Sequence, residues 1–310
     1  MTIPSELKKN EIYPARITGY TSEGAGVCRI GERAVFVPGT IVGEEWDVRI
    51  VRSTSAAVWG RGETLRSPSP HRAEPDCPAY PRCGGCALRH MDYEEELSLK
   101  LQRVNDALHR IGKLDFSVSG ILPAPEDARQ RRKVIFNVAE QNGRPVAGFY
   151  RARSHEVVPV PDCPAVPKEA LACAQTVLDW MEREHIPVYD EAAKRDGVRH
   201  IFYRSSHLTE KAVLTLTASR SPGEKALGIL TDMLRERCPD VTGLVLNRNT
   251  ARGNTVLAGE FDTVWGSEVL TEGLCGLTFT LSPRSFFQVN PPQAEGCMKP
   301  RSAMPVSRRA

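Results

Sequence analysis

Hydrophobic and polar residues alternate in the first part of the chain, which predicts a series of short strands. Trp46, Val48 and Ile50 are separated by charged residues, the two-residue period of a strand with one buried face. Glycine pairs interrupt the neighbouring hydrophobic stretches where turns are expected. Several short strands so close together predict a small antiparallel barrel over residues 1–68, followed by a proline-rich linker.

A different hydrophobic period follows the linker. Apolar residues from Leu97 to Ile111 recur at steps of four and three, which predicts a helix over 93–111 whose apolar stripe packs into a core. Further on, Asn142 and Gly143 lie between two strand-like stretches and predict a hairpin. Strands and helices then mix up to residue 290. The predicted fold class is therefore multidomain α+β, with the barrel followed by a mixed α+β domain at 74–290.

The end of the chain lacks any such pattern. The last fifteen residues, from Gly296, contain four basic residues, no acid, no aromatic and no apolar period. A segment of this kind cannot bury enough surface to offset the entropy lost on ordering. We expect residues 291–310 to form an aberrant, disordered tail.

Composition narrows the class of protein. The chain has 310 residues, of which 41% are hydrophobic and 25% charged, as in soluble globular proteins. No apolar run approaches the roughly 20 residues that cross a bilayer, and the start lacks a secretion signal. We therefore expect a cytoplasmic protein with no membrane partner. The net charge of +3 is too small to identify a binding partner.

Nine cysteines in a chain without an export signal disfavour a disulfide framework and leave thiols available for a metal. Cys77, Cys83 and Cys86 lie within ten residues, and two glycines allow the backbone to bend between the last two. The most prominent candidate for a fourth ligand is Cys163, because its Pro-Asp-Cys-Pro-Ala surroundings repeat those of Cys77 letter for letter.

Three interpretations of these cysteines compete. An iron–sulfur cluster accepts three near ligands and a distant one. A structural zinc site with four cysteines usually shows two close pairs, and this sequence has one. Chance clustering of core cysteines fits poorly with the surrounding prolines and glycines. We favour the [4Fe-4S] cluster and keep zinc as the alternative.

A basic stretch follows the predicted helix. Seven basic residues and one acid, Glu140, lie between Arg129 and Arg153, and the predicted hairpin would bring both ends of the stretch together. Cationic groups with interleaved aromatic rings suit single-stranded RNA, although a solvated basic face over core aromatics explains the pattern equally well. The candidate RNA-binding residues are Arg131, Arg132, Lys133, Phe136, Arg151 and Arg153.

Together these features resemble the RNA uracil-C5 methyltransferases that carry an iron–sulfur cluster and make 5-methyluridine in ribosomal RNA. Residues 24–28, 35–39 and 42–44 are similar to a TRAM domain, an RNA-binding small barrel. The cysteine loop resembles the family's cluster motif, which implies Cys163 as the fourth ligand.

Two further segments carry the resemblance. Arg131, Arg132 and Lys133 are similar to the basic strand of the family. Residues 282–290 are similar to its Phe-x-Gln-Val-Asn motif, whose glutamine contacts S-adenosylmethionine, and this implies Gln288 as a cofactor-binding residue.

The resemblance covers residues 10 to 295. In the family, a Rossmann-like methyltransferase domain follows and supplies the glycine-rich cofactor turn, the nucleophilic cysteine and the general base. We find no such turn in this sequence and name no catalytic residue. We therefore expect that domain to be missing through a shifted reading frame or a truncated gene, and S-adenosylmethionine to be bound poorly.

The expected function follows from this. The chain would keep the RNA-binding and cluster parts of a ribosomal RNA methyltransferase, be inactive alone and need no obligate protein partner. The alternative is a stand-alone iron–sulfur RNA-binding module without methyl transfer. A radical enzyme that uses the cluster with S-adenosylmethionine fits less well, because such enzymes leave one iron without a protein ligand and four cysteines are available here.

Overall fold

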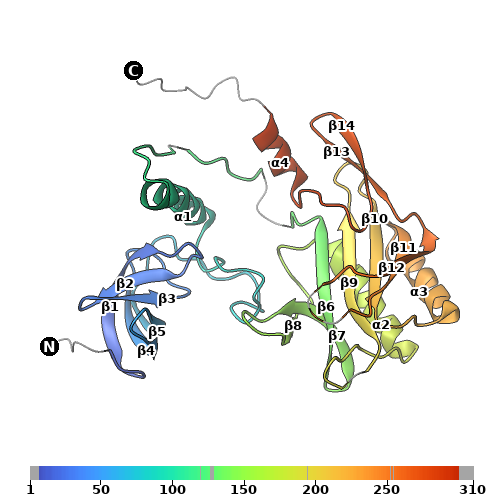
Figure 1. Cartoon of the computed structure of the whole chain (residues 1–310), viewed down its shortest axis with the longest axis horizontal. Coiled ribbons are helices and arrows are strands. Elements are labelled where there is room, and N and C mark those ends of the chain that lie inside the picture. Colours follow the sequence, from blue (N-terminus) through green and yellow to red (C-terminus); the bar gives the residue numbers. More distant parts are fainter. Residues whose placement is uncertain are drawn as a thin grey trace. The chain divides into compact units, whose positions relative to one another are not determined.

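The computed structural model describes residues 7–118, 120–125, 129–193, 195–251, 253 and 255–299. The chain divides into two compact units (Figure 1). Met1–Pro81 and Cys86–Pro123 form the first, here called the barrel unit, and Arg82–Gly85 and Ala124–Ala310 form the second, the sheet unit. The predicted cysteine loop is thus divided between them, because four of its residues belong to the sheet unit.

Five strands of the barrel unit close into a barrel (Figure 1). One of the pairings, β3 with β5, is parallel, although the alternation predicted antiparallel strands only. Side chains such as Ile17, Val35 and Val58 fill the interior and are at most 1% exposed. In barrel order the strands are β1 (Ile12–Tyr20), β2 (Gly26–Ile30), β3 (Arg33–Val37), β5 (Val58–Ser67) and β4 (Glu45–Ser53).

The helix of the barrel unit covers the predicted range, 93–111, and changes helix type near its end. Helix α1 spans Tyr93–Asp106 and continues as a π-helical turn over Ala107–Ile111. Asp92 caps it by accepting a hydrogen bond from the backbone N of Glu95 at 2.9 Å.

The apolar stripe of this helix does not form core, contrary to the prediction. Within α1 only Leu99 is buried, and this residue, which lies outside the stripe, packs with Ile41 and Met91. Val104 and Ile111 in the stripe are 47% and 82% exposed. The periodicity correctly indicated an amphipathic helix, but the helix contacts the barrel through another face.

The sheet unit is built on a mixed seven-stranded sheet in which β10 and β11 are parallel and the other pairs are antiparallel. Helices α2 (Lys168–Arg183) and α3 (Glu224–Arg237) cover one face, as Figure 1 shows. In sheet order the strands are β12 (Glu260–Gly266), β11 (Val241–Arg248), β10 (Ala212–Ala218), β9 (Val198–Ser205), β6 (Lys133–Gln141), β7 (Arg144–Tyr150) and β8 (Val157–Pro159).

The predicted hairpin is confirmed as β6 and β7. Its turn residues Asn142 and Gly143 both have positive φ angles, 53° and 74°, as a two-residue hairpin turn requires. The hairpin register pairs Asn137 with Gly148, so the start of β6 and the end of β7 lie at the same end of the hairpin.

The last described part contains a two-stranded ribbon, β13 (Leu270–Leu274) with β14 (Leu277–Leu281), and helix α4 (Pro291–Met298). This helix corrects the expectation of disorder from residue 291 onward. Asn290 accepts a hydrogen bond from the backbone N of Gln293 at 3.2 Å, and proline begins the helix, so local capping orders a segment that lacks apolar periodicity. The rest of the predicted tail, 300–310, lies outside the described residues. In the part that the structure describes, no helix has the length and apolar character needed to cross a membrane.

Candidate RNA interface and cysteine loop

One corner of the sheet unit gathers basic side chains. Lys133 opens β6 and pairs with Arg204 on β9, so two cationic residues lie directly opposite each other. Burial, and then the charge of Arg204, lower the pKa of Lys133. Arg132 precedes Lys133, and its guanidinium group lies 3.3 Å from Nδ1 of His207. Arg131 is half-buried. Three of the predicted RNA-binding residues therefore lie together where β6, an inner strand of the sheet, begins.

The segment 282–290, which contains the predicted cofactor residue, is fixed to this corner. Arg204 donates to the carbonyl oxygens of Ser282 at 2.7 Å and Ser285 at 2.6 Å. The backbone N of Arg132 donates to the carbonyl oxygen of Val289 at 2.9 Å. Gln288 is exposed on this segment. The structure thus brings Gln288 and the basic start of β6 together, although more than 150 residues separate them in the sequence.

The two other predicted arginines follow the end of β7. Arg151 is exposed, forms an isolated β-bridge with Cys83 and pairs with Glu156 at 3.1 Å. Arg153 is exposed and has a φ angle of 59°. Glu156 offsets the charge of Arg151. The segment after β7 therefore contributes less net positive charge than the start of β6.

Phe136 does not belong to the surface. It is 1% exposed and stacks on Phe149 with ring centroids 5.6 Å apart, so its ring is not available to RNA and we omit it from the interface. The alternation in Val134, Phe136 and Val138, all buried, was the signal that this ring belongs to the core.

The glycines of the cysteine loop have separate roles in the sheet unit. The backbone N of Gly84 donates to the carbonyl oxygen of Tyr150 at 2.9 Å, which fixes the loop beside the end of β7. The backbone N of Gly85 donates to Sγ of Cys83 at 3.4 Å. An amide that donates to a cysteine sulfur is an arrangement common around iron–sulfur clusters.

Cys163 lies in the sheet unit, in a loop that Arg129 holds. The guanidinium group of Arg129 donates to the carbonyl oxygens of Cys163 at 3.2 Å and Val166 at 2.9 Å, and to Asp162 at 3.1 Å. Cys163 itself is 7% exposed. Arg129 belongs to the basic stretch, but its guanidinium group is hydrogen-bonded to this loop.

Cys77 and Cys86 belong to the barrel unit and are partly exposed. Nearby, the hydroxyl group of Tyr80 lies 2.7 Å from Nδ1 of His90, and Arg89 donates to Asp76, the residue before Cys77. Burial raises the pKa of Tyr80. Across the described residues, no group of three or more His, Cys, Asp or Glu side chains is arranged to hold a metal ion.

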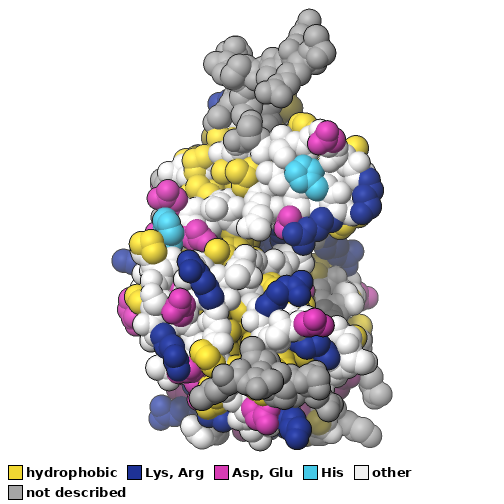
Figure 2. Space-filling model, turned by 90° about the vertical axis from the view of Figure 1, so that its left-hand side faces the viewer, with side chains coloured by type: hydrophobic (Ala, Val, Ile, Leu, Met, Phe, Trp, Pro, Cys, Tyr) yellow, Lys and Arg dark blue, Asp and Glu magenta, His cyan; other side chains and the backbone are white. Residues whose placement is uncertain are grey.

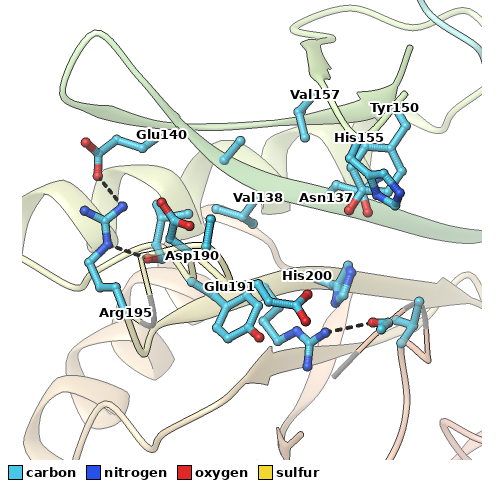
Figure 3. A pocket seen from close by; sticks show the side chains of 17 residues that line it. Asn137, Val138, Glu140, Tyr150, His155, Val157, Asp190, Glu191, Arg195 and His200 are labelled. Atoms are coloured by element: carbon cyan, nitrogen blue, oxygen red, sulfur yellow. Dashed lines mark hydrogen bonds and ion pairs between the residues drawn. The ribbon is translucent and has the colours of Figure 1, made fainter. Parts of the chain in front are cut away.

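A cavity of about 710 Å³ in the sheet unit was not predicted from the sequence (Figure 3). Its polar lining includes Asn137, Tyr150, Asp190 and His200, which come from four separate segments. No motif links them, so only the folded sheet assembles the cavity.

Charge is mixed on one face of the molecule. On the face shown in Figure 2, lysine and arginine side chains are interspersed with aspartate and glutamate, without a broad basic field. The basic corner at the start of β6 is therefore a local feature, and an RNA interface has to be argued from it.

Comparison with known proteins identifies the barrel. Residues 6–61 match the family model of the TRAM domain. The chain contains a TRAM domain. The similarity expected from residues 24–28, 35–39 and 42–44 is thereby confirmed. The matched range contains strands β1 to β4 and the beginning of β5.

Beyond the TRAM domain, the chain is similar to bacterial RNA methyltransferases. It is 33% identical to an uncharacterized RNA methyltransferase of Clostridium tetani over 93% of this chain and 63% of that protein. A relative from Listeria innocua is 31% identical over 94% of this chain and 64% of its own length. The chain thus spans just under two thirds of the curated relatives that it matches.

A solved structure has the same fold. The tRNA (uracil-54, C5)-methyltransferase of Pyrococcus abyssi, in complex with S-adenosyl-L-homocysteine, superposes with a TM-score of 0.71 at 21% sequence identity. The superposition covers 92% of this chain and 63% of that protein.

These matches overturn two expectations. We expected a fold class defined by a missing methyltransferase domain, and a truncated, inactive RNA-binding chain or stand-alone module. Both are wrong, because the chain follows RNA methyltransferases over 93% of its own length and corresponds to the larger part of each, 63%.

Proposed function

We propose that this chain binds RNA and takes part in its methylation by S-adenosylmethionine, with carbon C5 of a uracil as the acceptor. The observation that carries the proposal is the similarity to RNA methyltransferases along 93% of the chain. The TRAM domain at 6–61 and the basic corner at the start of β6 support RNA as the substrate.

In this reaction the methyl group moves from the sulfonium of the donor to C5, C5 loses its proton, and S-adenosylhomocysteine is released. We assign Gln288 to contact the donor, and Arg131, Arg132 and Lys133 to contact RNA phosphates. The hydrogen bond from Arg132 to Val289 supports this assignment, because it keeps the proposed donor contact beside the proposed RNA contacts.

For the RNA we propose ribosomal RNA, which implies a cytoplasmic enzyme. The fold is shared with a protein named for uracil 54 of tRNA, so tRNA is the natural second substrate to test. The two RNAs differ in the folded surroundings of the uracil, which the enzyme reads largely by shape.

The methylation assay combines the full chain with labelled S-adenosylmethionine and unmodified ribosomal RNA or tRNA. We expect label in 5-methyluridine of ribosomal RNA. Gln288→Ala should lower methyl transfer at least tenfold while RNA binding, measured separately, stays the same. Gln102→Ala on the exposed surface of α1 is the matched control. If neither ribosomal RNA nor tRNA becomes labelled, the proposed activity is contradicted. If tRNA alone becomes labelled, the proposed substrate is contradicted.

We also propose a [4Fe-4S] cluster held by Cys77, Cys83, Cys86 and Cys163. The local chemistry fits it: a backbone amide donates to Sγ of Cys83, and Arg129 fixes the loop of Cys163. We assign the cluster no part in the methyl transfer.

Anaerobic purification tests the cluster. We expect a brown protein with equal amounts of iron and acid-labile sulfide. Cys83→Ser and Cys163→Ser should each lose most of the iron, whereas Cys275→Ser, at an exposed cysteine outside the proposed set, should retain it. A colourless protein, or one in which zinc replaces iron, would contradict the cluster.

A further inference from the structure

The cavity of about 710 Å³ lies in the sheet unit and involves strands β6, β7 and β9 (Figure 3). Its volume is that of typical small-molecule sites. Phe136, on the helix side of β6, lines a separate hollow with residues of α2. Asn137, the next residue along the strand, lines the large cavity, so it points to the sheet face opposite α2.

The floor of the cavity is polar, and one of its buried nitrogen atoms lacks a hydrogen-bond partner among the described residues. His200 on β9 pairs directly with Asn137 on β6, so both side chains project from the same face. His200 is 8% exposed, and its Nδ1 has no hydrogen-bond partner among the described residues. Buried polar atoms without partners are costly, which points to a polar ligand at His200.

Flat rings line the cavity beside this floor. Tyr150 at the end of β7 is 39% exposed and packs against His155 with ring centroids 5.3 Å apart. Tyr189 carries the guanidinium group of Arg199 over its ring, 4.5 Å from the centroid. Figure 3 shows Tyr150 and His155 side by side near Asn137. Exposed rings beside amide and imidazole groups are the means by which proteins bind unstacked bases.

The charges in the cavity disfavour a phosphate. Among the described residues of the lining, both guanidinium groups are already used: Arg195 pairs with Glu140 at 3.0 Å, and Arg199 donates to the carbonyl oxygens of Asn249, Ala251 and Gly253. Asp190 and Glu191 add two more carboxylates to the lining. Carboxylate oxygens accept hydrogen bonds from amino groups, so the lining suits a neutral ligand with amino hydrogens.

We propose that this cavity binds one unstacked RNA base that carries an exocyclic amino group, separate from the uracil that is methylated. The inference rests on the proposed RNA binding. Asn137 lies four residues along β6 from Lys133, roughly 13 Å at the usual rise of a strand, and alternation places both on the same face. A single strand whose phosphates contact the basic corner can therefore place a neighbouring base in the cavity.

Binding of poly(A) and poly(U) to the full chain at fixed salt tests the proposal. We expect poly(A) to bind more tightly, and Tyr150→Ala and Asn137→Ala each to weaken poly(A) binding about tenfold with little effect on poly(U). Lys133→Ala is the control for the phosphate contacts and should weaken both polymers equally. Variants that weaken both polymers alike, or neither, would overturn the base pocket while leaving RNA binding intact.

A second measurement does not depend on RNA binding. Adenosine and uridine, which carry no phosphate, are titrated into the unchanged chain and followed by NMR. We expect adenosine to perturb residues around Asn137 and uridine to bind more weakly; Tyr150→Phe, which keeps the ring, should retain adenosine binding. Adenosine binding without any RNA binding would support the pocket and refute the proposed function. Failure of adenosine to bind would overturn the pocket.

Discussion

At the scale of single residues, Gly84 shows how closely the cysteine loop approaches β7. A Cβ atom at this position would lie 2.8 Å from the carbonyl oxygen of Tyr150 and 2.8 Å from the backbone N of Ala152. Both are backbone atoms, which cannot move aside as a flexible side chain could. We therefore expect Gly84→Ala to displace the loop and lower the free energy of unfolding by about 1–3 kcal/mol, measured by urea denaturation, and to reduce the iron content.

Gly19 on β1 is the matched control for this substitution. A Cβ atom there would have no neighbour within 4 Å, so Gly19→Ala adds the same atom without a clash. It should retain both stability and iron. If Gly84→Ala unfolds like the unchanged chain, the hydrogen bond from Gly84 to Tyr150 does not fix the loop.

His200 gives the sheet unit a predictable response to acid. Burial, followed by the charge of Arg199, lowers the pKa of His200 to about 4. Between this value and the usual pKa of about 6.5, the unfolded chain binds the proton and the folded chain does not, so stability falls as the pH falls. From pH 7 to pH 4 we expect this residue to cost of order 3 kcal/mol of the free energy of unfolding.

The contribution of His200 is isolated by comparing the unchanged chain with His200→Gln in urea titrations between pH 4 and pH 7. The variant should lose part of the acid sensitivity, whereas His185→Gln, at an exposed position just after α2, should keep all of it. Parallel pH profiles of the unchanged chain and His200→Gln would show that the pKa of His200 is the same in the folded and unfolded states.

At the scale of elements, a buried carboxylate joins the barrel to the segment that follows it. Glu44 lies just before β4, is 0% exposed and accepts hydrogen bonds from Nε1 of Trp46 and the backbone N of Ile41, both at 2.8 Å. Arg72 from beyond β5 donates to the same carboxylate at 2.7 Å. Burial alone would raise the pKa of Glu44, but these donors lower it below its usual value.

Glu44→Gln should therefore be severe, because it removes the negative charge that neutralises the guanidinium group of Arg72. We expect a loss of roughly 3–5 kcal/mol in the free energy of unfolding of the barrel unit at pH 7. The lowered pKa means that the carboxylate stabilises the fold above the unfolded pKa and loses this effect as the pH falls, so the difference between variant and parent should shrink in acid.

Glu63→Gln tests whether this effect is specific to the buried site. Glu63 pairs with Arg49 and Arg61 at the barrel surface, where water screens the charges, and its loss should change stability little. Thermal unfolding of the two variants at pH 7 compares them directly. Equal shifts would mean that the donors around Glu44 do not outweigh the cost of its burial.

Local patterns in the sequence predicted those elements whose determinants are themselves local. The β6–β7 hairpin follows from Asn142 and Gly143, and the TRAM barrel from alternation and glycine turns. The apolar stripe of α1 predicted a helix but not the face that packs, because packing depends on Leu99 meeting Ile41 and Met91. Helix α4 escaped prediction because one capping residue, Asn290, outweighs the absence of periodicity.

The candidate site, too, could be predicted from the sequence only in part. The consecutive basic residues before β6 could be found from the sequence, but their approach to the Gln288 segment depends on long-range hydrogen bonds from Arg132 and Arg204. The cavity around Asn137 and His200 depends on strand register across the sheet, which no short motif encodes. Phe136, in contrast, has a local signal for its place in the core, because it alternates with the buried Val134 and Val138.

At the scale of the whole molecule, RNA binding must come from local charge. The chain carries only three net positive charges, and opposite charges are mixed over the face in Figure 2. An interface limited to the start of β6 makes few phosphate contacts, so affinity should fall with salt along a shallow slope. Each phosphate contact to a single strand contributes a slope of about 0.7 in a plot of log affinity against log salt.

The double variant Arg131→Ala with Lys133→Ala should therefore reduce that slope by about 1.4 and weaken all single-stranded sequences alike. Lys168→Ala with Lys225→Ala removes the same charge from exposed positions in the first turns of α2 and α3. If RNA binds through the corner, fluorescence titrations over a range of salt should distinguish the two variants although their net charges are equal. Equal slopes would mean that net charge alone attracts the RNA, and the interface would then have to lie elsewhere on the molecule.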